Sequence, residues 1–569
     1  MVNVKNLFGM AVMATALVGC SSSDDLATDV KGNENKTEAT YAKFTIQLPT
    51  VSGTRTAGDP LFEGGTAKEY AVKDAQLVIF EKTPTSSSEG DYKFVETVKI
   101  GNLEPWNDQN SQGVTRYANI TAQLNGVSLD KTGGKYFALV ILNNDGESKV
   151  TLPTSGTYSV WNAADHAKSA AEFLKSDNGF YMANAPKYVA GDEPTTLVPI
   201  KGVYSTKAEA QNKPATTVYV ERGMAKVTIG SSTFDADKPV TTSTNYAGDK
   251  VTITNWTLDV LNKTTFPVHK TDGLNTIWNQ TWASRFFDNT STEFKRVYWG
   301  VDPNYSMTTL TDVDACKGQF YLLDRDGSTY NFDGTTGTGS SVTWADKTTP
   351  LYCLENTFDI NNMKQGQTTR VVFKATYTPA AVASETDKTF FMIGNNPKIW
   401  TMTTLKQQIT NKVQELLKST SVSVTINAGA NLLKAGSHKV TAADITITGT
   451  TASLNYDELN TKLGLDNTPG IKTYKNGECY YIARIKHFNE LTPWASGQDL
   501  YGGDNEKYLG RYGVLRNNWY DLTVSKVSAP GYPDVPEVNP TEPDDEDTKY
   551  INVEVKILDW AKRSQQVEL

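Results

Sequence analysis

The feature that most limits how this chain can fold is an isolated alternating segment near its C-terminal end. Aliphatic residues alternate there with other residues ahead of an aromatic one, at Ile551, Val553, Val555, Ile557 and Trp560. Such alternation predicts a strand with one apolar face. A lone strand exposes that face and a row of unpaired backbone groups, so it must pair with a sheet edge, in its own chain or in another.

The preceding segment, residues 529–547, contains five prolines and a run of acidic residues. Proline cannot donate a hydrogen bond to a sheet ladder, so this segment is not expected to be a core strand. Prolines and like charges together predict an extended, solvated and self-repelling spacer. Such a spacer would allow the C-terminal strand to extend away from the rest of its own domain.

A second alternating strand is predicted near the other end, at Tyr41–Thr50. It is followed by a loop with Gly and Pro, residues 51–60, whose single basic residue is Arg55. Flexible loops of this kind are where proteases cut. We therefore predict cleavage after Arg55, so that the mature chain begins at Thr56 and the first strand is no longer covalently held.

The two ends of the chain are complementary in this interpretation. Departure of the first strand would expose an apolar groove and unpaired sheet hydrogen bonds, and the C-terminal strand of a second copy could fill it. Repetition head-to-tail gives a polymer that does not close. Four buried aliphatic side chains at ~1.5–3 kcal/mol each would stabilise every joint by several kcal/mol. The alternative is that the C-terminal strand is an ordinary edge strand of its own domain.

The first residues form an export signal rather than part of the fold. Residues 1–20 open with Lys5, continue through an apolar run and end in Gly19-Cys20, which resembles a lipoprotein signal with lipidation at Cys20. The run is shorter than the ~20 residues that cross a bilayer as a helix. The polar residues after Cys20 predict a tether, and we expect the mature protein to be soluble or surface-tethered.

The rest of the sequence predicts a mostly β protein of more than one domain, because Tyr, Thr, Gly and Asn are abundant and the chain has 569 residues. A polar linker is predicted at 231–248. The ranges are a signal peptide at 1–20, a propeptide with the detachable strand at 21–55, two domains at 56–235 and 236–528, and a spacer with the C-terminal strand at 529–569. Strands are predicted at 75–80, 136–142, 179–184, 217–229, 251–261, 421–426, 444–447, 479–485 and 519–524, and helices at 163–174 and 405–417.

Charge and chemistry-bearing residues exclude several classes of function. A formal charge of −9 leaves no basic field for nucleic acid. The cysteines and histidines show no metal-ligand spacing, and a Cys316–Cys353 disulfide stays open. The turn 324–327 lacks a full calcium loop. With no recognisable catalytic neighbourhood, we expect no enzyme, cofactor or metal.

In order along the chain, several segments together resemble the FimA/Mfa-type fimbrillins of Bacteroidales, and among them the stalk subunits of short fimbriae. They are the signal ending at Cys20, Gly53–Ala57, Glu221–Val227, Tyr480–Ala483, Tyr512–Tyr520 and Trp560–Leu569. The inserted polar loops, such as Gly327–Gly339, depart from the family pattern.

This resemblance implies two transthyretin-like β-sandwich domains, an outer-membrane lipoprotein precursor and cleavage at Arg55 by an arginine-specific protease. It further implies a structural subunit of a cell-surface fimbria that polymerises by donor-strand exchange and supports adhesion and biofilm formation. The implied partners are other copies of the chain, anchor and tip or accessory subunits, and host or bacterial surface receptors. The rival functions are a fimbrial tip or accessory adhesin and a surface glycan-binding lipoprotein that never polymerises.

Overall fold

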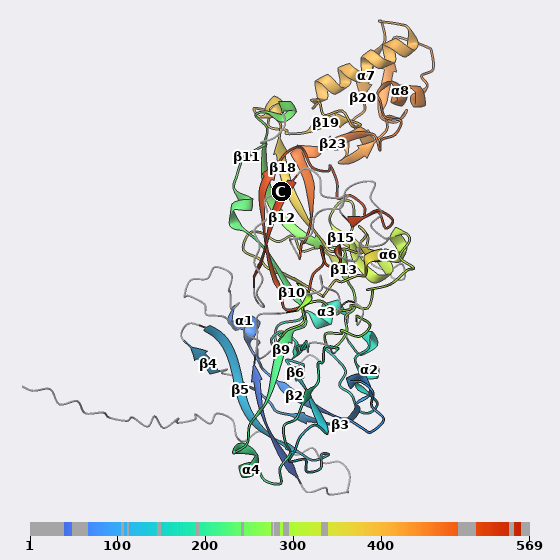
Figure 1. Ribbon diagram of the computed structural model, residues 1–569. Coiled ribbons are helices and arrows are strands. Elements are labelled where there is room, and N and C mark those ends of the chain that lie inside the picture. The colour runs from blue at the N-terminus through green and yellow to red at the C-terminus, as the bar shows by residue number, and fades with distance from the viewer. Residues whose placement is uncertain are drawn as a thin grey trace, which may run out of the picture.

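The structure is a computed structural model that describes most of the chain. The described residues are 39–47, 66–103, 107–110, 113–144, 149–167, 169–188, 193–240, 244–274, 277, 285–287, 295–331, 340–487, 508–544 and 551–558. They form a mostly β protein, as predicted, with an N-terminal sheet at one end, a central sandwich and a small lobe at the other end (Figure 1). Within these residues, no helix has both the length and the apolar character needed to cross a bilayer.

The N-terminal sheet has nine strands in the order β3-β2-β6-β7-β9-β1-β5-β4, with β8 paired to β6. Their bounds are β1 Thr40–Gln47, β2 Ala75–Glu81, β3 Lys93–Lys99, β4 Asn107–Asn110, β5 Gly113–Leu124, β6 Tyr136–Leu142, β7 Met182–Asn184, β8 Val198–Pro199 and β9 Thr216–Arg222. Four short helices accompany it: α1 Ala67–Tyr70, α2 Tyr158–Trp161, α3 Ala170–Phe173 and α4 Lys207–Gln211.

Both faces of this sheet are covered, which explains the continuous apolar runs in its strands. In β2, Leu77 and Ile79 belong to one hydrophobic cluster, whereas Val78 and Phe80 belong to a second cluster. Aromatic residues of α2 and α3 complete the second cluster.

The central sandwich consists of two four-stranded sheets whose facing side chains form one core. One sheet has the order β11-β12-β18-β24 and the other β17-β10-β25-β26. The bounds are β10 Ala225–Ile229, β11 Lys238–Pro239, β12 Lys250–Asp259, β17 Leu351–Cys353, β18 Arg370–Thr378, β24 Glu478–Arg484, β25 Trp519–Val527 and β26 Ile551–Leu558. Beside it lies a small sheet with helix α6 Val313–Gln319, formed by β13 Leu261–Asn262, β14 Phe320–Leu323, β15 Thr329–Asn331 and β16 Ser340–Ser341.

A small α/β lobe is inserted between β18 and β24 and lies at the far end of the molecule from the N-terminal sheet (Figure 1). Its elements are β19 Phe390–Ile393, α7 Met402–Leu417, β20 Ser423–Ile426, β21 Gly436–His438, β22 Ile445–Thr448, α8 Tyr456–Lys462 and β23 Ile471–Tyr474. The predicted helix at 405–417 is confirmed, because Leu405, Ile409 and Val413 are fully buried. They pack against Val424 of β20, so the helix covers a sheet as expected.

Two predicted elements differ from the structure. The segment 163–174 is not one helix, because Ala167 is extended and forms a β-bridge with Val150 before α3 begins. The predicted strand 217–229 is two strands, since the chain leaves the N-terminal sheet and enters the central sandwich at Gly223. A Cβ at Gly223 would lie 2.7 Å from the Phe173 ring, so only glycine fits this crossing. The change of sheet precedes residue 235, where we placed the boundary, and the domain ranges stay a prediction.

The proline-rich segment is not the solvated spacer that its sequence predicts. Its described part follows β25 without any named strand, as expected for so many prolines. However, Val535, Val538 and Asp544 are all at most 5% exposed, and the segment lies against the central sandwich. The prediction of a solvated, self-repelling spacer is therefore wrong for residues 529–544, because the folded body buries part of the segment and bonds several of its backbone groups.

Candidate functional site

The strand nearest the N-terminus, β1, lies inside the N-terminal sheet. It pairs antiparallel with β5 over all eight of its residues and parallel with β9 over Phe44–Gln47. Ala42, Phe44 and Ile46 have no exposed surface and belong to one hydrophobic cluster of the sheet. The chain therefore places an early, short strand where its removal would leave two strand edges unpaired and an apolar groove between them.

The strand nearest the C-terminus, β26, lies at the edge of its sheet. It pairs antiparallel with β25 of the same chain, from Val527↔Ile551 to Trp519↔Leu558. The predicted strand is confirmed, and the structure places it on its own chain as an edge strand. The four alternating aliphatic positions are register partners of four buried residues of β25, namely Tyr520, Leu522, Val524 and Val527.

Helix α1, which follows Thr66, attaches this part of the chain to strands of two sheets. Glu69 accepts hydrogen bonds from Lys226 Nζ and from Tyr352 Oη, both 2.7 Å from its Oε1 atom. Burial raises the pKa of Glu69, but the bonds from Lys226 and Tyr352 outweigh burial, so its pKa lies below the usual value. The backbone oxygen of Glu69 accepts a bond of 2.8 Å from Arg222 Nε. These partners lie on β9, β10 and β17, so α1 is attached to both the N-terminal sheet and the central sandwich.

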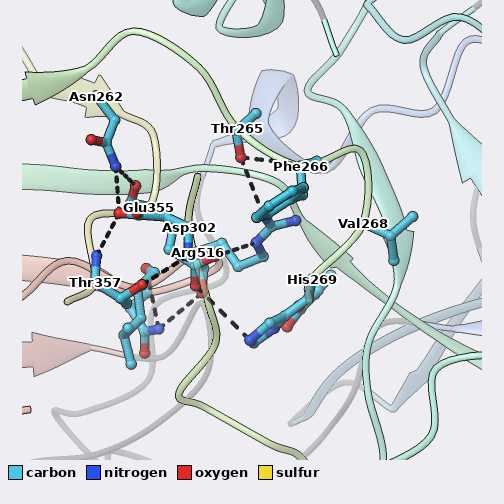
Figure 2. A network of polar contacts seen from close by, with 12 residues as sticks. Asn262, Thr265, Phe266, Val268, His269, Asp302, Glu355, Thr357 and Arg516 are labelled. Carbon is cyan, nitrogen blue, oxygen red and sulfur yellow. Dashed lines mark hydrogen bonds and ion pairs between the residues drawn. The ribbon is translucent and has the colours of Figure 1, made fainter. Parts of the chain in front are cut away.

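A buried polar network also joins the N-terminal sheet to the segments around the central sandwich. Glu221, at the end of β9, lies 2.7 Å from Arg296 Nη2 and 2.7 Å from His269 Nδ1. Burial raises the pKa of Glu221, but the charges of Arg296 and His269 outweigh it and leave the pKa below its usual value. Arg516, just before β25, donates to Glu355 at 3.1 Å (Figure 2).

The same network contains a carboxyl group that holds its proton near neutral pH. Asp302 accepts hydrogen bonds from Thr357 N at 2.8 Å and from Asn262 Nδ2 at 2.6 Å (Figure 2). It is 2% exposed, and burial raises its pKa to about 7. A second hydrogen bond from Asn262, to the backbone oxygen of Glu355, links it to the ion pairs. We interpret this network as structural, because its groups lie inside the protein and contact one another.

Several predicted site residues lie outside the described part of the chain. These are Cys20, Arg55, Thr56 and Trp560, so the lipidation, the cleavage site and the end of the C-terminal strand stay predictions. Ile551, Val553, Val555 and Ile557 are described as backbone positions of β26. The structure does not bring β1 and β26 together within one chain, since they belong to different sheets.

Two features with no signal in the sequence are the anchoring of residues 529–544 and the buried network around Glu221. In the sequence, only the family resemblance points to Glu221 and Arg222. Among the described residues, no group of three or more histidine, cysteine or acidic side chains could hold a metal ion. Cys316, Cys353 and Cys479 are buried free thiols, so Cys316 and Cys353 are not bonded to each other.

Comparison with known proteins gives a match to a family model near the C-terminal end of the chain. Residues 472–566 match the family model of the major fimbrial subunit protein type IV, fimbrillin, C-terminal. This region contains β24, β25 and β26 together with the proline-rich segment. The match supports a fimbrial subunit, a class of structural proteins.

Solved structures of fimbrial proteins are also similar to this chain. A fimbrilin from Porphyromonas gingivalis W83 is 11% identical with a TM-score of 0.38, and the alignment covers 91% of this chain and 96% of that one. The tip fimbrial protein Mfa3 from Porphyromonas gingivalis, with a C-terminal truncation, is 12% identical with a TM-score of 0.25 over 91% and 100% of the two chains. A fimbrial assembly protein from Parabacteroides distasonis is 9% identical with a TM-score of 0.23 over 60% and 96%. No curated protein sequence matches the chain.

Proposed function

We propose that this chain is the stalk subunit of a cell-surface fimbria, and that copies of it polymerise by donor-strand exchange after proteolysis. The observation that carries the proposal is the position of β1, an eight-residue strand with both edges paired inside a sheet. Its forward connection to the rest of the fold runs through residues 48–65, which include Arg55. One cut there would leave β1 attached by noncovalent contacts alone.

Cleavage after Arg55 would give a mature chain that begins at Thr56. The groove vacated by β1 offers the free edges of β5 and β9 and the apolar cluster that Phe44 and Ile46 now complete. Burial of two such side chains is worth ~1.5–3 kcal/mol each, and backbone hydrogen bonds add to this. A vacated groove is therefore a strong acceptor for another apolar strand.

Strand β26 is the proposed donor. It alternates apolar and other residues as β1 does, and it is held by a single ladder at a sheet edge. Insertion of one subunit's β26 into the groove of the next gives a head-to-tail filament. Each subunit then both donates and accepts one strand.

The remaining parts of the proposal follow from the sequence and the family resemblance. The precursor is an outer-membrane lipoprotein acylated at Cys20, and its mature part has two transthyretin-like β-sandwich domains. An arginine-specific protease is the maturation partner. The filament joins anchor and tip or accessory subunits, binds host or bacterial surface receptors, and supports adhesion and biofilm formation.

The first test changes the cleavage site. Arg55→Ala and Arg55→Lys should both leave an unpolymerised precursor in the presence of an arginine-specific protease. Only the Arg55→Lys protein should polymerise once a lysine-specific protease is added, because it restores a cut at that residue. N-terminal sequencing of wild-type filaments should begin at Thr56. Normal filaments from Arg55→Ala would overturn the assignment.

The second test removes the donor. A chain that lacks Ile551–Leu569 should fold, accept a donor strand and fail to give one, so it should cap growth when mixed with full-length protein. Detergent-resistant ladders on gels report polymer length. If the cleaved full-length protein releases β1 but stays a monomer and never forms ladders, a tip adhesin or a glycan-binding lipoprotein would be favoured instead.

A further inference from the structure

The segment between β25 and β26 is bound tightly to the body of its own subunit. We name residues 529–544 the strap. At its start, Tyr532 exchanges two backbone hydrogen bonds with Tyr480 of β24, each 2.8 Å between nitrogen and oxygen. The Tyr474 hydroxyl, from the base of the lobe, donates to Gly531 O at 2.9 Å. The strap thus begins as an addition to the edge of the sandwich.

The middle of the strap covers a buried arginine. Arg370 Nη2 donates to Pro536 O at 2.6 Å, while Arg370 Nε pairs with Asp259 at 2.8 Å. Val535 and Val538 on either side are 1% and 5% exposed. Lifting the strap would expose both valines and remove a partner from the guanidinium of Arg370, a residue that is 1% exposed.

The end of the strap is the most strongly held position. Asp544 has no exposed surface, and its Oδ2 accepts from Thr368 Oγ1 at 3.0 Å. Its backbone nitrogen donates to Met363 O at 3.2 Å, and its backbone oxygen accepts from Arg484 Nε at 3.3 Å. Arg511 Nη2 lies 3.8 Å from Oδ1. Extraction of Asp544 would separate its buried carboxylate from Arg511 and remove a backbone partner from the buried Arg484. Leaving a buried charge without its partner is costly.

The strap and β26 lie on different sheets of the sandwich. The strap adds to the edge strand β24 of one sheet and binds Arg370 of β18, whereas β26 pairs with β25 at the edge of the other sheet. We propose that the strap stays on its own subunit during assembly and that Asp544 is the fixed point from which the donor strand turns to the next subunit. This inference rests on the proposed function and makes Asp544 a positioning residue.

A fixed point at Asp544 limits how far the donor can reach. Six residues, 545–550, separate Asp544 from β26. At most ~3.6 Å per residue, the seven steps from Asp544 to Ile551 span about 25 Å. The groove of the accepting subunit must therefore begin within about 25 Å of the donor's Asp544, which requires close contact between successive subunits.

Two disulfide locks test this inference on the full mature chain. Lys364 and Pro543 are antiparallel bridge partners, and so are Thr523 and Glu554. Such partners have Cα separations that suit a disulfide. The Lys364→Cys/Pro543→Cys variant pins the end of the strap, and the Thr523→Cys/Glu554→Cys variant pins β26 to its own subunit. Peptide mapping by mass spectrometry confirms each bond against the three native thiols.

The oxidised strap lock should polymerise after cleavage at a rate within twofold of the wild type. The oxidised β26 lock should stay monomeric and polymerise once a reductant is added. Failure of the strap lock to polymerise, with recovery on reduction, would overturn the inference while leaving donor-strand exchange intact. Normal polymerisation of the oxidised β26 lock would instead overturn the proposed function itself.

Discussion

The two end strands differ in how the fold holds them. Strand β1 has a neighbour on each edge and three side chains without exposed surface, whereas β26 has one neighbour and lies at an edge. A strand with two ladders cannot leave by peeling from one side alone, but an edge strand can. In the proposed assembly the two strands therefore have different roles. Strand β1 would be exchanged only after a covalent cut, whereas β26 could leave its sheet edge without one.

The largest effect is expected from Phe44→Ala in β1. Truncation of this buried ring should cost the uncleaved precursor ~3–5 kcal/mol of unfolding free energy. It should leave the stability of mature filaments unchanged, because β1 is absent from them, and should speed assembly after cleavage. Urea unfolding of the precursor and of filaments measures both.

Lys43→Ala is the matched control, since the Lys43 side chain lies at the surface and should contribute within about 0.5 kcal/mol. Equal losses in precursor and filament for Phe44→Ala would mean that β1 is never released.

A smaller effect is expected from Val553→Asp in β26. Its register partner Val524 is 1% exposed, so the position faces a buried residue of β25. An unpaired carboxylate is strongly resisted at such a site, and even its protonated form costs about 1–3 kcal/mol. We therefore expect shorter ladders at equal protein concentration. Glu554→Gln, one position along the strand, should leave ladder length unchanged. Equal shortening of the ladders by both changes would show that the two positions do not lie on opposite faces of β26.

The smallest effect on assembly is expected from lengthening the connections that follow β1 and precede β26. Four Gly and Ser residues inserted after Asp547 should change the closure free energy of that connection by less than ~0.6 kcal/mol. The same insertion before Arg55 should also leave cleavage and assembly within twofold of the wild type. Loss of assembly from either insertion would show that the connection itself must adopt a specific conformation. The difference between a central and an edge strand does not require this.

A change in the buried network should affect the stability of the precursor and of the mature protein equally. Because the pKa of Asp302 is about 7 in the folded protein, above its ordinary 3.8, the folded state keeps a proton that the unfolded chain has released. The contribution of this group to stability is therefore fully present below about pH 4 and is lost as pH rises to about 7. Thermal melts of Asp302→Asn should show a weaker decline of Tm over that window, equally in precursor and mature protein.

Alternation and proline content predicted the two end strands, the helix α7 and the lack of a named strand in the described segment 529–544. Those features depend on local pattern, which a sequence displays directly. The strap was mispredicted because its prolines and acids describe its own backbone, whereas Arg370, Arg484 and Arg511 that bind it lie elsewhere in the chain. The crossing at Gly223 was missed for a similar reason, since two alternating strands in sequence do not reveal that they enter different sheets.

The lobe beyond the central sandwich has a consequence for how such a protein can diversify. The chain leaves β19 at Ile393 and returns to β23 at Ile471, and these two residues are direct register partners. Everything between them packs largely around a hydrophobic cluster of its own. An excursion that starts and ends at adjacent points can be exchanged for another without rerouting the rest of the chain. Such an exchange would leave the strands β1, β5, β9 and β26 unchanged, because none of them lies in the lobe.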